Sequence, residues 1–595
     1  MIKSRISRLR DWMVRHQLSA FIIPSADPHL GEYIAPRWKS REWISGFTGS
    51  AGTVVITLEK GGLWTDSRYF IQAEAQLQGS GIELYKSCQR EMSGEIPNWL
   101  LQELPEDSRV GIDGHLLTQV EAETLENSLS AKHIALVTEK EPMGEIWEDR
   151  PSFPANPIEI YDAKYTGQSA SERLSLLRQE LGKLDADSLF VTPLDEIAWV
   201  LLIRGTDVQY NPVAISYLLV TAEEAILFID PSKCPKEVVE HLKNEGIQTC
   251  PYTEALPTLR SLQNRRLLMP SGKTSVASYK AASESGCTLL SADSPLSWMK
   301  CIRTETEIEG LRQCMIYDGV ALVKFQRWLT DAVQCGEKIT EISLDRKLYE
   351  FRAEQPLFRG ESFATIAGYG AHAASPHYCA TPETNATLEA RGYLLLDSGG
   401  QYLNGTTDIT RTIVLGPLTE DEKIDYTCVL RGHINLASVK FPKGTNGTQL
   451  DALARAPLWE RGMQFLHGTG HGVGHYLNVH EGTDVYQFRM SYMPHPLMLH
   501  SNITNEPALY KPGSHGTRTE NMMLVCYDQI TEFGEFYRFE TLTLCPIDTE
   551  AIIKSMLTPH EIHWLNTYHE QVYDRLSPYL NNEEQEWLRD KCTAI

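Results

Sequence analysis

Hydrophobic residues recur with two different periods in the first third of the chain. Residues 3–17 place apolar side chains at helical spacing, and residues 20–24 (AFIIP) form a short continuous apolar run. The first pattern predicts an amphipathic helix and the second a buried strand. Two more apolar segments, 53–57 and 63–66, lie on either side of Lys60-Gly61-Gly62. They predict a β-hairpin with its turn at these three residues.

The same order of patterns returns later in the chain. Residues 171–181 resemble the first helix, 188–193 the first strand, and 214–230 the hairpin. Helix–strand successions are common, so chance could produce one such match. Because three elements recur in order, we predict two copies of one small α/β domain. The segment 148–157 (EDRPSFPANP), with three prolines, is expected to link the copies.

A second boundary is expected near Pro295. Beyond it, Thr304 and Glu307 have the spacing of a capping box, and a long amphipathic helix follows. Glycine-rich and strand-like patterns dominate residues 360–545, and the last 40 residues return to helical spacing. The pattern therefore predicts a mixed α/β (α+β) protein of three domains. Their expected bounds are 1–155, 156–297 and 298–595.

Composition removes several classes of function. The 595 residues include 78 acidic and 55 basic ones, for a formal charge of −23. Nucleic acid is not expected as a partner, because phosphate backbones require a basic face. No run of 18 apolar residues occurs, so no membrane partner is expected. The 12 cysteines include no CxxC pair, and the first 17 residues lack the apolar core of a signal peptide. We therefore expect a cytoplasmic protein.

Carboxylates at the ends of apolar runs are the main candidates for chemistry. A buried ionised carboxylate must be paired or must bind a metal. A lone aspartate at a strand end usually forms a turn, and a lone histidine among glycines is usually structural. Four carboxylates and one imidazole together, however, suit two divalent cations such as manganese, cobalt, iron(II) or zinc. The five candidate ligands are Asp397, Asp408, His471, Glu506 and Glu520.

Asn404-Gly405 is a strong hairpin turn signal between the two aspartates. A regular hairpin centred on it would pair Asp397 with position 412 rather than with Asp408. The sequence therefore predicts that the aspartates lie on neighbouring strands, and it leaves their register open.

Two motifs carry a resemblance to a known family. HGTGHGVGHYLNVHEG (467–482) and NGTTDITRT (404–412) resemble signatures of the pita-bread metallopeptidases, which include methionine aminopeptidase, prolidase, creatinase and aminopeptidase P. The spacings along the sequence from Asp397 to Asp408 and from Glu506 to Glu520 are similar to those in the cytosolic, three-domain aminopeptidases P. GEYIAPR, GFTGSAGT, LWTDSRYF and LDEIAWVLLIRGTDV resemble that family's non-catalytic domains, so the likeness covers nearly the whole chain.

This resemblance implies a fold and an activity. Two creatinase-like α/β domains are expected before a pita-bread domain with a curved antiparallel sheet. The implied activity is metal-dependent release of the N-terminal residue from peptides with proline at the second position. Two divalent ions are expected, with manganese preferred and zinc or cobalt as alternatives. A homodimer is also expected.

The resemblance further assigns a role to each motif residue. Asp408 and Glu520 are expected to bridge the metals, His471 and Glu506 to complete one metal's ligands, and Asp397 to complete the other's. Glu506 is also the expected proton carrier. The remaining residues are expected to bind the substrate or to support the ligands, and the histidines among them are also expected to be catalytic. These residues are His377, His467, His480, Arg518 and Tyr510.

Some alternatives remain open at this stage. Ala508 and Thr519 depart from the family pattern next to candidate ligands, and His475 is expected to be structural. A prolidase acting on dipeptides is the nearest alternative, although the two N-terminal copies and the C-terminal extension favour aminopeptidase P. A creatinase fits less well, because its metal-free chemistry does not need five ligands. A non-catalytic binding module would usually have lost some of them.

Overall fold

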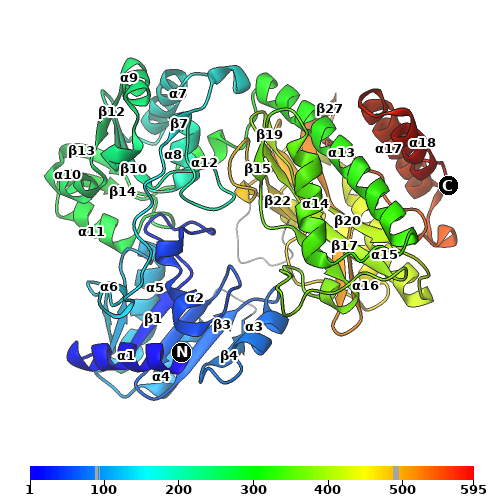
Figure 1. Ribbon diagram of the computed structural model, residues 1–595. Helices are drawn as coiled ribbons and strands as arrows, with labels where there is room; N and C mark the ends of the chain where they lie inside the picture. Colours follow the sequence, from blue (N-terminus) through cyan, green and yellow to red (C-terminus); the bar gives the residue numbers. More distant parts are fainter. Residues whose placement is uncertain (88–91, 93, 487–494) are drawn as a thin grey trace. The chain divides into compact units, whose positions relative to one another are not determined.

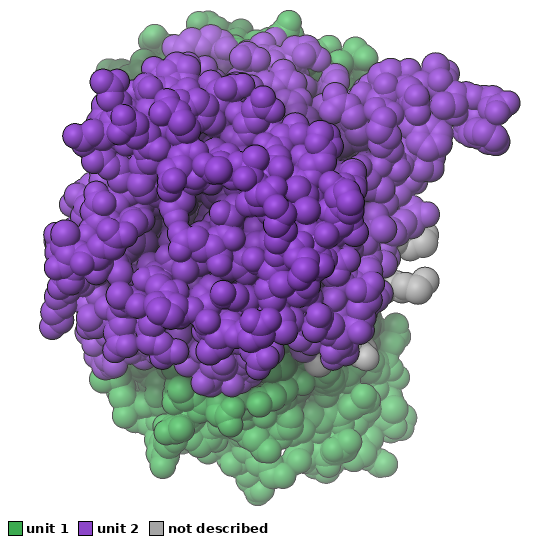
Figure 2. All heavy atoms as spheres, turned by 90° about the vertical axis from the view of Figure 1, so that its right-hand side faces the viewer, with its two compact units in different colours: residues 1–163, 168–296 green, residues 164–167, 297–595 purple. Residues whose placement is uncertain are grey.

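The protein is described by a computed structural model that covers residues 1–87, 92, 94–486 and 495–595. It consists of two compact units, shown as a ribbon in Figure 1 and in separate colours in Figure 2. Unit 1 comprises residues 1–163 and 168–296, and unit 2 comprises residues 164–167 and 297–595. Among the described residues, no helix combines the length and the apolarity needed to cross a bilayer.

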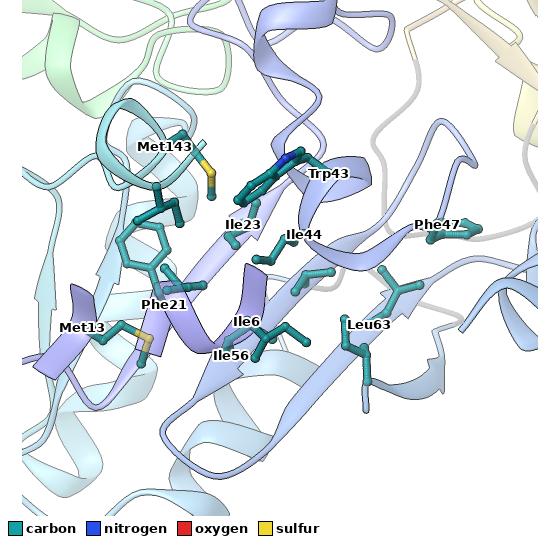
Figure 3. Close-up of a cluster of buried hydrophobic side chains, with 14 of the residues drawn as sticks. Ile6, Met13, Phe21, Ile23, Trp43, Ile44, Phe47, Ile56, Leu63 and Met143 are labelled. Carbon is teal, nitrogen blue, oxygen red and sulfur yellow. The ribbon is translucent and has the colours of Figure 1, made fainter. Parts of the chain in front are cut away.

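The first half of unit 1 is a six-stranded sheet with helices on both faces. Its strand order is β4-β3-β2-β1-β5-β6. Ile6 and Met13 of the first helix pack with Ile23 and Ile44 on one face, as Figure 3 shows. The amphipathic pattern of residues 3–17 forms a helix here because its apolar stripe is buried against this face of the sheet. The elements are α1 (Ile2–Arg15), β1 (Ala20–Pro24), α2 (Ser40–Ser45), β2 (Thr53–Thr57), β3 (Gly61–Thr65), α3 (Phe70–Gln76), β4 (Glu83–Lys86), α4 (Glu95–Glu103), β5 (Arg109–Ile112), α5 (Gln119–Leu129), β6 (Ala135–Val137) and α6 (Met143–Ile146).

The second half of unit 1 repeats the first. Its sheet has the order β12-β11-β10-β8-β13-β14, and each strand pair has the same parallel or antiparallel sense as its counterpart in the first sheet. The predicted duplication is therefore confirmed. The elements are β7 (Glu159–Ile160), α7 (Ala170–Lys183), β8 (Ser188–Val191), α8 (Leu194–Val200), β9 (Ile203–Arg204), β10 (Ser216–Thr221), β11 (Ala225–Ile229), α9 (Lys236–Asn244), β12 (Ile247–Cys250), α10 (Ala255–Ser261), β13 (Gln263–Leu268), α11 (Val276–Ser283) and β14 (Gly286–Leu290). Helix α12 (Pro295–Met299) includes the residues at which unit 1 ends and unit 2 begins.

The first hairpin turns earlier than predicted. The amide of Thr57 donates to the carbonyl of Lys60, so the chain reverses at residues 58–59 and both glycines lie in β3. A Cβ on Gly62 would lie 2.7 Å from the ring of Trp64, and one on Gly61 2.9 Å from Ile56. The glycines are therefore needed for space beside these side chains, and the predicted turn at Lys60-Gly61-Gly62 was wrong.

Unit 2 is built from antiparallel sheets and helices. Thr304 and Glu307 form the predicted capping box at the start of the long helix α13 (Glu305–Gln334). In Figure 1 the C-terminal helices, drawn in red, lie beside α13, and the first of them also contacts α15 (Glu420–Ala437). The elements are α13 (Glu305–Gln334), α14 (Glu341–Ala353), β15 (Phe358–Glu361), β16 (Ile366–Tyr369), η7 (Gly370–Ala374), β17 (Tyr393–Ser398), β18 (Gly400–Tyr402), β19 (Gly405–Thr406), β20 (Ile409–Val414), α15 (Glu420–Ala437), β21 (Lys440–Pro442), α16 (Gly447–Trp459), β22 (Gly470–Gly472), β23 (Glu481–Tyr486), β24 (Asn502–Asn505), β25 (Ala508–Lys511), β26 (His515–Arg518), β27 (Asn521–Thr531), β28 (Gly534–Thr541), α17 (Pro559–Leu576) and α18 (Asn582–Lys591).

The structure sets the register between β17 and β20, which the sequence left open, and it is not that of a regular hairpin centred on Asn404-Gly405. Asp397 pairs with Thr410 rather than with position 412, and Tyr402 pairs with Gly405. The turn is therefore at residues 403–404, and Gly405 belongs to β19. A Cβ at Gly405 would lie 2.7 Å from the sulfur of Cys314 on α13, so the glycine lets the hairpin pack closely on this helix.

Candidate functional site

Short strands of unit 2 bring the candidate ligands together. Asp408 lies between β19 and β20, His471 lies in β22, and Glu520 lies between β26 and β27. One ligand atom from each of these three residues lies within 4.8 Å of the other two. Glu506 follows β24, and its Oε1 is 3.6 Å from Nε2 of His471. Residues separated by more than a hundred positions thus form one cluster.

Asp397 joins the cluster from β17. One of its carboxylate oxygens, Oδ2, accepts a hydrogen bond from Nη2 of Arg518. The other, Oδ1, is buried and has no hydrogen-bond partner among the described residues. Burial of an unpaired carboxylate oxygen is costly. A cation beside Oδ1 would remove that cost.

The neighbouring carboxylates of the cluster raise each other's pKa values. Burial raises the pKa of Asp408 well above its ordinary range, and the charges of Asp397 and Glu506 raise it further. Burial and the charge of Asp408 act in the same way on the pKa of Glu520. Burial also raises the pKa of Asp397, although Arg518 opposes the shift. Positive charge at the cluster would oppose these shifts and favour the ionised carboxylates.

His471 presents a nitrogen lone pair to this cluster. Its Nδ1 donates to the carbonyl of Gly472 at 2.9 Å, so Nε2 is the unprotonated nitrogen of the neutral ring. Nε2 lies 3.4 Å from Oδ2 of Asp408. A lone pair and a carboxylate oxygen repel each other unless a cation or a proton lies between them. This tautomer, the orphaned Oδ1 of Asp397 and the four carboxylates all fit a site for divalent cations.

Arg518 connects the ligands to the neighbouring residues. Its Nη1 donates to the hydroxyl of Tyr510, and its Nε donates to Oγ1 of Thr410 at 2.9 Å. Thr410 in turn donates to Oε2 of Glu520 at 2.7 Å. The guanidinium therefore supports both Asp397 and Glu520, the latter through Thr410. A planar group with five donors is well suited to this task.

Sequence reasoning missed Thr410. Its side chain is fully buried and contacts both a candidate ligand and Arg518. A signal was present, because alternation along DITRT places positions 408 and 410 on one side of the strand. Thr504 was also missed, and its Oγ1 accepts from the amide of His471 at 3.0 Å.

The other predicted histidines lie around the cluster. The ring of His480 packs edge-on against His471, with ring centroids 4.3 Å apart. Nε2 of His467 is 2.9 Å from the hydroxyl of Tyr510. His467 uses Nδ1 to donate to Gly468, so the tyrosine is the donor to Nε2. His475 is buried close to Gly310 of α13, which fits a structural role.

His377 is on a separate loop that reaches the cluster. It follows η7, and the carbonyl of the preceding Pro376 accepts a hydrogen bond from Nη2 of Arg518 at 3.4 Å. The structure thus brings the backbone of this loop to the same arginine that holds Asp397.

Comparison with known proteins covers both units. A model of the metallopeptidase family M24 matches residues 309–526, and one of the C-terminal region of peptidase M24 matches residues 535–595. Models of the creatinase/prolidase N-terminal domain match residues 5–141 and 149–307. These matches confirm the predicted succession of two creatinase-like domains and a pita-bread domain.

Full-length relatives are also similar. A probable Xaa-Pro aminopeptidase P from Laccaria bicolor is 40% identical, over 99% of this chain and 93% of its own length. Xaa-Pro aminopeptidase 1 from Dictyostelium discoideum is 38% identical, over 100% and 97%. The crystal structure of an X-prolyl aminopeptidase from Caenorhabditis elegans superposes with a TM-score of 0.95 at 33% identity, covering 100% of both chains. The chain therefore belongs to the Xaa-Pro aminopeptidase (aminopeptidase P) family of M24 metallopeptidases.

Proposed function

We propose that this protein is a metal-dependent exopeptidase that releases the N-terminal residue from peptides with proline at the second position. The observation that carries the proposal is the convergence of the complete donor set. Asp408, His471 and Glu520 present ligand atoms within 4.8 Å of one another, with Asp397 and Glu506 beside them. The relatives named as Xaa-Pro aminopeptidases match the chain from end to end. That match favours an aminopeptidase over a prolidase, a creatinase or a non-catalytic binding module.

The same donor set is proposed to hold two divalent ions. Asp408 and Glu520 would lie between them, His471 and Glu506 would complete the ligands of one ion, and Asp397 those of the other. The C. elegans relative is described as a cytosolic enzyme with a di-nuclear active site, which supports this assignment. Manganese is the proposed metal, with zinc and cobalt as alternatives. When bound, such ions lower the pKa of water at the site and polarise the scissile carbonyl.

Glu506 is proposed to carry the proton. Its backbone amide is held by the carbonyl of Thr469 at 2.7 Å, and its side chain retains 18% exposure. A held but accessible carboxylate can take a proton from the attacking water and deliver it to the leaving nitrogen. His480 and His377 are proposed to donate hydrogen bonds to the oxygen that develops negative charge. His467 and Tyr510 are proposed to contact the substrate beside Arg518.

A proline requirement has a simple physical basis. The imide nitrogen has no hydrogen, and the ring fixes the backbone φ angle. A site that contacts the ring directly loses nothing from the missing N–H. A substrate with alanine at that position loses the ring contacts and has more conformational freedom to give up on binding.

The test compares two tripeptides that differ only at the second residue. The protein is treated with a chelator and reloaded with manganese, zinc or cobalt, and cleavage of Arg-Pro-Pro is compared with cleavage of Arg-Ala-Pro. We expect kcat/KM for the proline peptide to be on the order of a hundredfold higher. Equal rates would indicate a general aminopeptidase. Cleavage of Arg-Pro without cleavage of Arg-Pro-Pro would indicate a prolidase, and no cleavage with any metal would refute the proposal.

Three further assignments belong to the proposal. The domains are proposed to span residues 1–155, 156–297 and 298–595, and the division of the chain at residue 296 supports the second boundary. A cytosolic location is proposed by analogy with the C. elegans enzyme. A homodimer is proposed, and the mass of the protein in solution, 67.2 kDa for one chain, would test it.

A further inference from the structure

The loop that carries His377 is fitted tightly against the candidate site. The loop runs from Tyr369 at the end of β16, through η7, to Ala386. On its inner side, the carbonyl of Ala373 faces Gly516 of β26, where a Cβ would lie only 1.8 Å from that oxygen. Arg518, also on β26, donates to Pro376. These contacts place the residues before His377 against the strand that carries Arg518.

One buried carboxylate holds both ends of this loop. Glu341, in the first turn of α14, has a fully buried side chain. At the start of the loop it accepts a hydrogen bond from the amide of Tyr369 at 2.9 Å and another from Nδ1 of His372 at 2.9 Å. It also accepts from the hydroxyl of Tyr378, in the middle of the loop, at 2.8 Å and from the amide of Ala386, at the far end, at 2.8 Å.

The four donors lie on both sides of His377. Tyr378 follows it directly, and the ring of His372 stacks on that of Tyr378 with centroids 4.5 Å apart. Tyr378 also packs in the small apolar cluster that contains Tyr510 of the site. The network around Glu341 therefore determines the position of the chain before and after His377.

A carboxylate is the side chain that this network requires. Two oxygens provide about four acceptor positions, and four donors occupy them. The amide of glutamine has one oxygen, so its NH2 group would face the backbone amide of either Tyr369 or Ala386, and neither amide can accept a hydrogen bond. Glu341 also lies at the N-terminal end of a 13-residue helix, where a negative charge is stabilised.

We propose that Glu341 is a positioning residue for the aminopeptidase reaction, which holds the 369–386 loop so that His377 meets the substrate. The proposal rests on the proposed function for the role of His377. Glu341 itself does not touch the ligand cluster. It acts only through the loop, so its effect on catalysis depends on the presence of the histidine side chain.

A double-mutant cycle tests this dependence. Kcat/KM for Arg-Pro-Pro is measured for the manganese-loaded wild type, Glu341→Gln, His377→Ala and the double variant. We expect Glu341→Gln to lower kcat/KM by on the order of tenfold or more in the wild-type background, because a misplaced catalytic group loses its orientation. In the His377→Ala background the same change should alter kcat/KM by less than about twofold. Equal losses in the two backgrounds, or no loss in either, would overturn the proposal.

Controls separate a local effect from a loss of fold. Glu350→Gln changes an exposed glutamate of the same helix, which pairs only at the surface with Lys347, and should leave kcat/KM unchanged. Tyr378→Phe removes one donor and provides a milder second variant if Glu341→Gln does not fold. It should show the same dependence on His377, with a smaller loss.

Hydrogen exchange measures the loop independently of activity. In metal-loaded protein, amides of residues 369–386 should exchange faster in Glu341→Gln than in Glu350→Gln. Unchanged exchange would overturn the proposed anchoring. If the wild type cleaves no Xaa-Pro peptide, the proposed function fails, and the exchange measurement still decides whether Glu341 holds the loop.

Discussion

Replacing Thr410 by valine is the most direct test of how the site is assembled. Valine keeps the β-branched shape that suits strand β20 and removes only the hydroxyl. That hydroxyl donates to Oε2 of Glu520 at 2.7 Å and accepts from Nε of Arg518 at 2.9 Å. The residue is fully buried, so water cannot replace the lost partner of either charged group.

The expected cost follows from these two bonds. A hydrogen bond to a charged group contributes about 1.5–3 kcal/mol, and the two together about 3–6 kcal/mol if they were additive. They belong to one network, so the lower end is expected. A loss of about 3 kcal/mol in transition-state stabilisation corresponds to a decrease in kcat/KM of roughly a hundredfold. Because Glu520 is a proposed ligand, the concentration of manganese needed for half-maximal activity should rise as well.

Thr412→Val is the matched control on the same strand. Thr412 is buried like Thr410, but its hydroxyl contacts only neutral groups, namely the backbone of Arg518 and the hydroxyl of Thr517. We expect it to lower kcat/KM by less than about tenfold and to leave the metal dependence unchanged. The assay is peptide hydrolysis at a series of manganese concentrations, with circular dichroism to confirm folding. Equal behaviour of the two variants, or wild-type activity in Thr410→Val, would refute the reasoning.

Three further predictions concern the ligands and the stability of unit 2. Asp408→Asn should lose bound metal and nearly all activity while remaining folded, and substantial activity in the well-folded variant would remove Asp408 from the site. His480→Ala should keep its metal and lower kcat by on the order of a hundredfold, whereas His471→Ala should lose metal, as elemental analysis would show. Burial lowers the pKa of His569 from 6.5 to about 4, so this residue contributes stability that is present above pH 6.5 and is lost as the pH falls toward 4. His569→Gln keeps an acceptor for the amide of Ile547. The unfolding free energy of this variant, measured by urea titration, should therefore fall between pH 7 and pH 4 by about 3 kcal/mol less than that of the wild type. An unchanged pH dependence in that variant would contradict this prediction.

Much of the local structure could be predicted from the sequence. The apolar period predicts helix α1, and the spacing of Thr304 and Glu307 predicts the capping box of α13. Both signals act within a few residues. The duplication in unit 1 was visible because the same short-range patterns recur in the same order. The five candidate ligands were singled out by their combined chemistry, because four carboxylates and one imidazole together suit divalent cations.

The glycines show where local reasoning fails. Gly61, Gly62 and Gly405 were interpreted as turn residues, but each lies in a strand where a side chain would collide with a neighbour. For Gly405 that neighbour is Cys314, ninety-one positions earlier in the chain. Glycine serves both as a flexible turn residue and as the smallest packing residue, and the sequence does not separate the two uses.

The sequence by itself determined most of the elements, the duplication and the set of candidate ligands, because each depends on side-chain chemistry or on periods of a few residues. Tertiary structure alone decided which residues meet. The pairing of Asp397 with Thr410, the contact of Thr410 with Glu520, and the anchoring of the His377 loop by Glu341 all join segments distant in the chain. Such contacts depend on strand register and on the packing of whole helices against sheets, and no local pattern records either one.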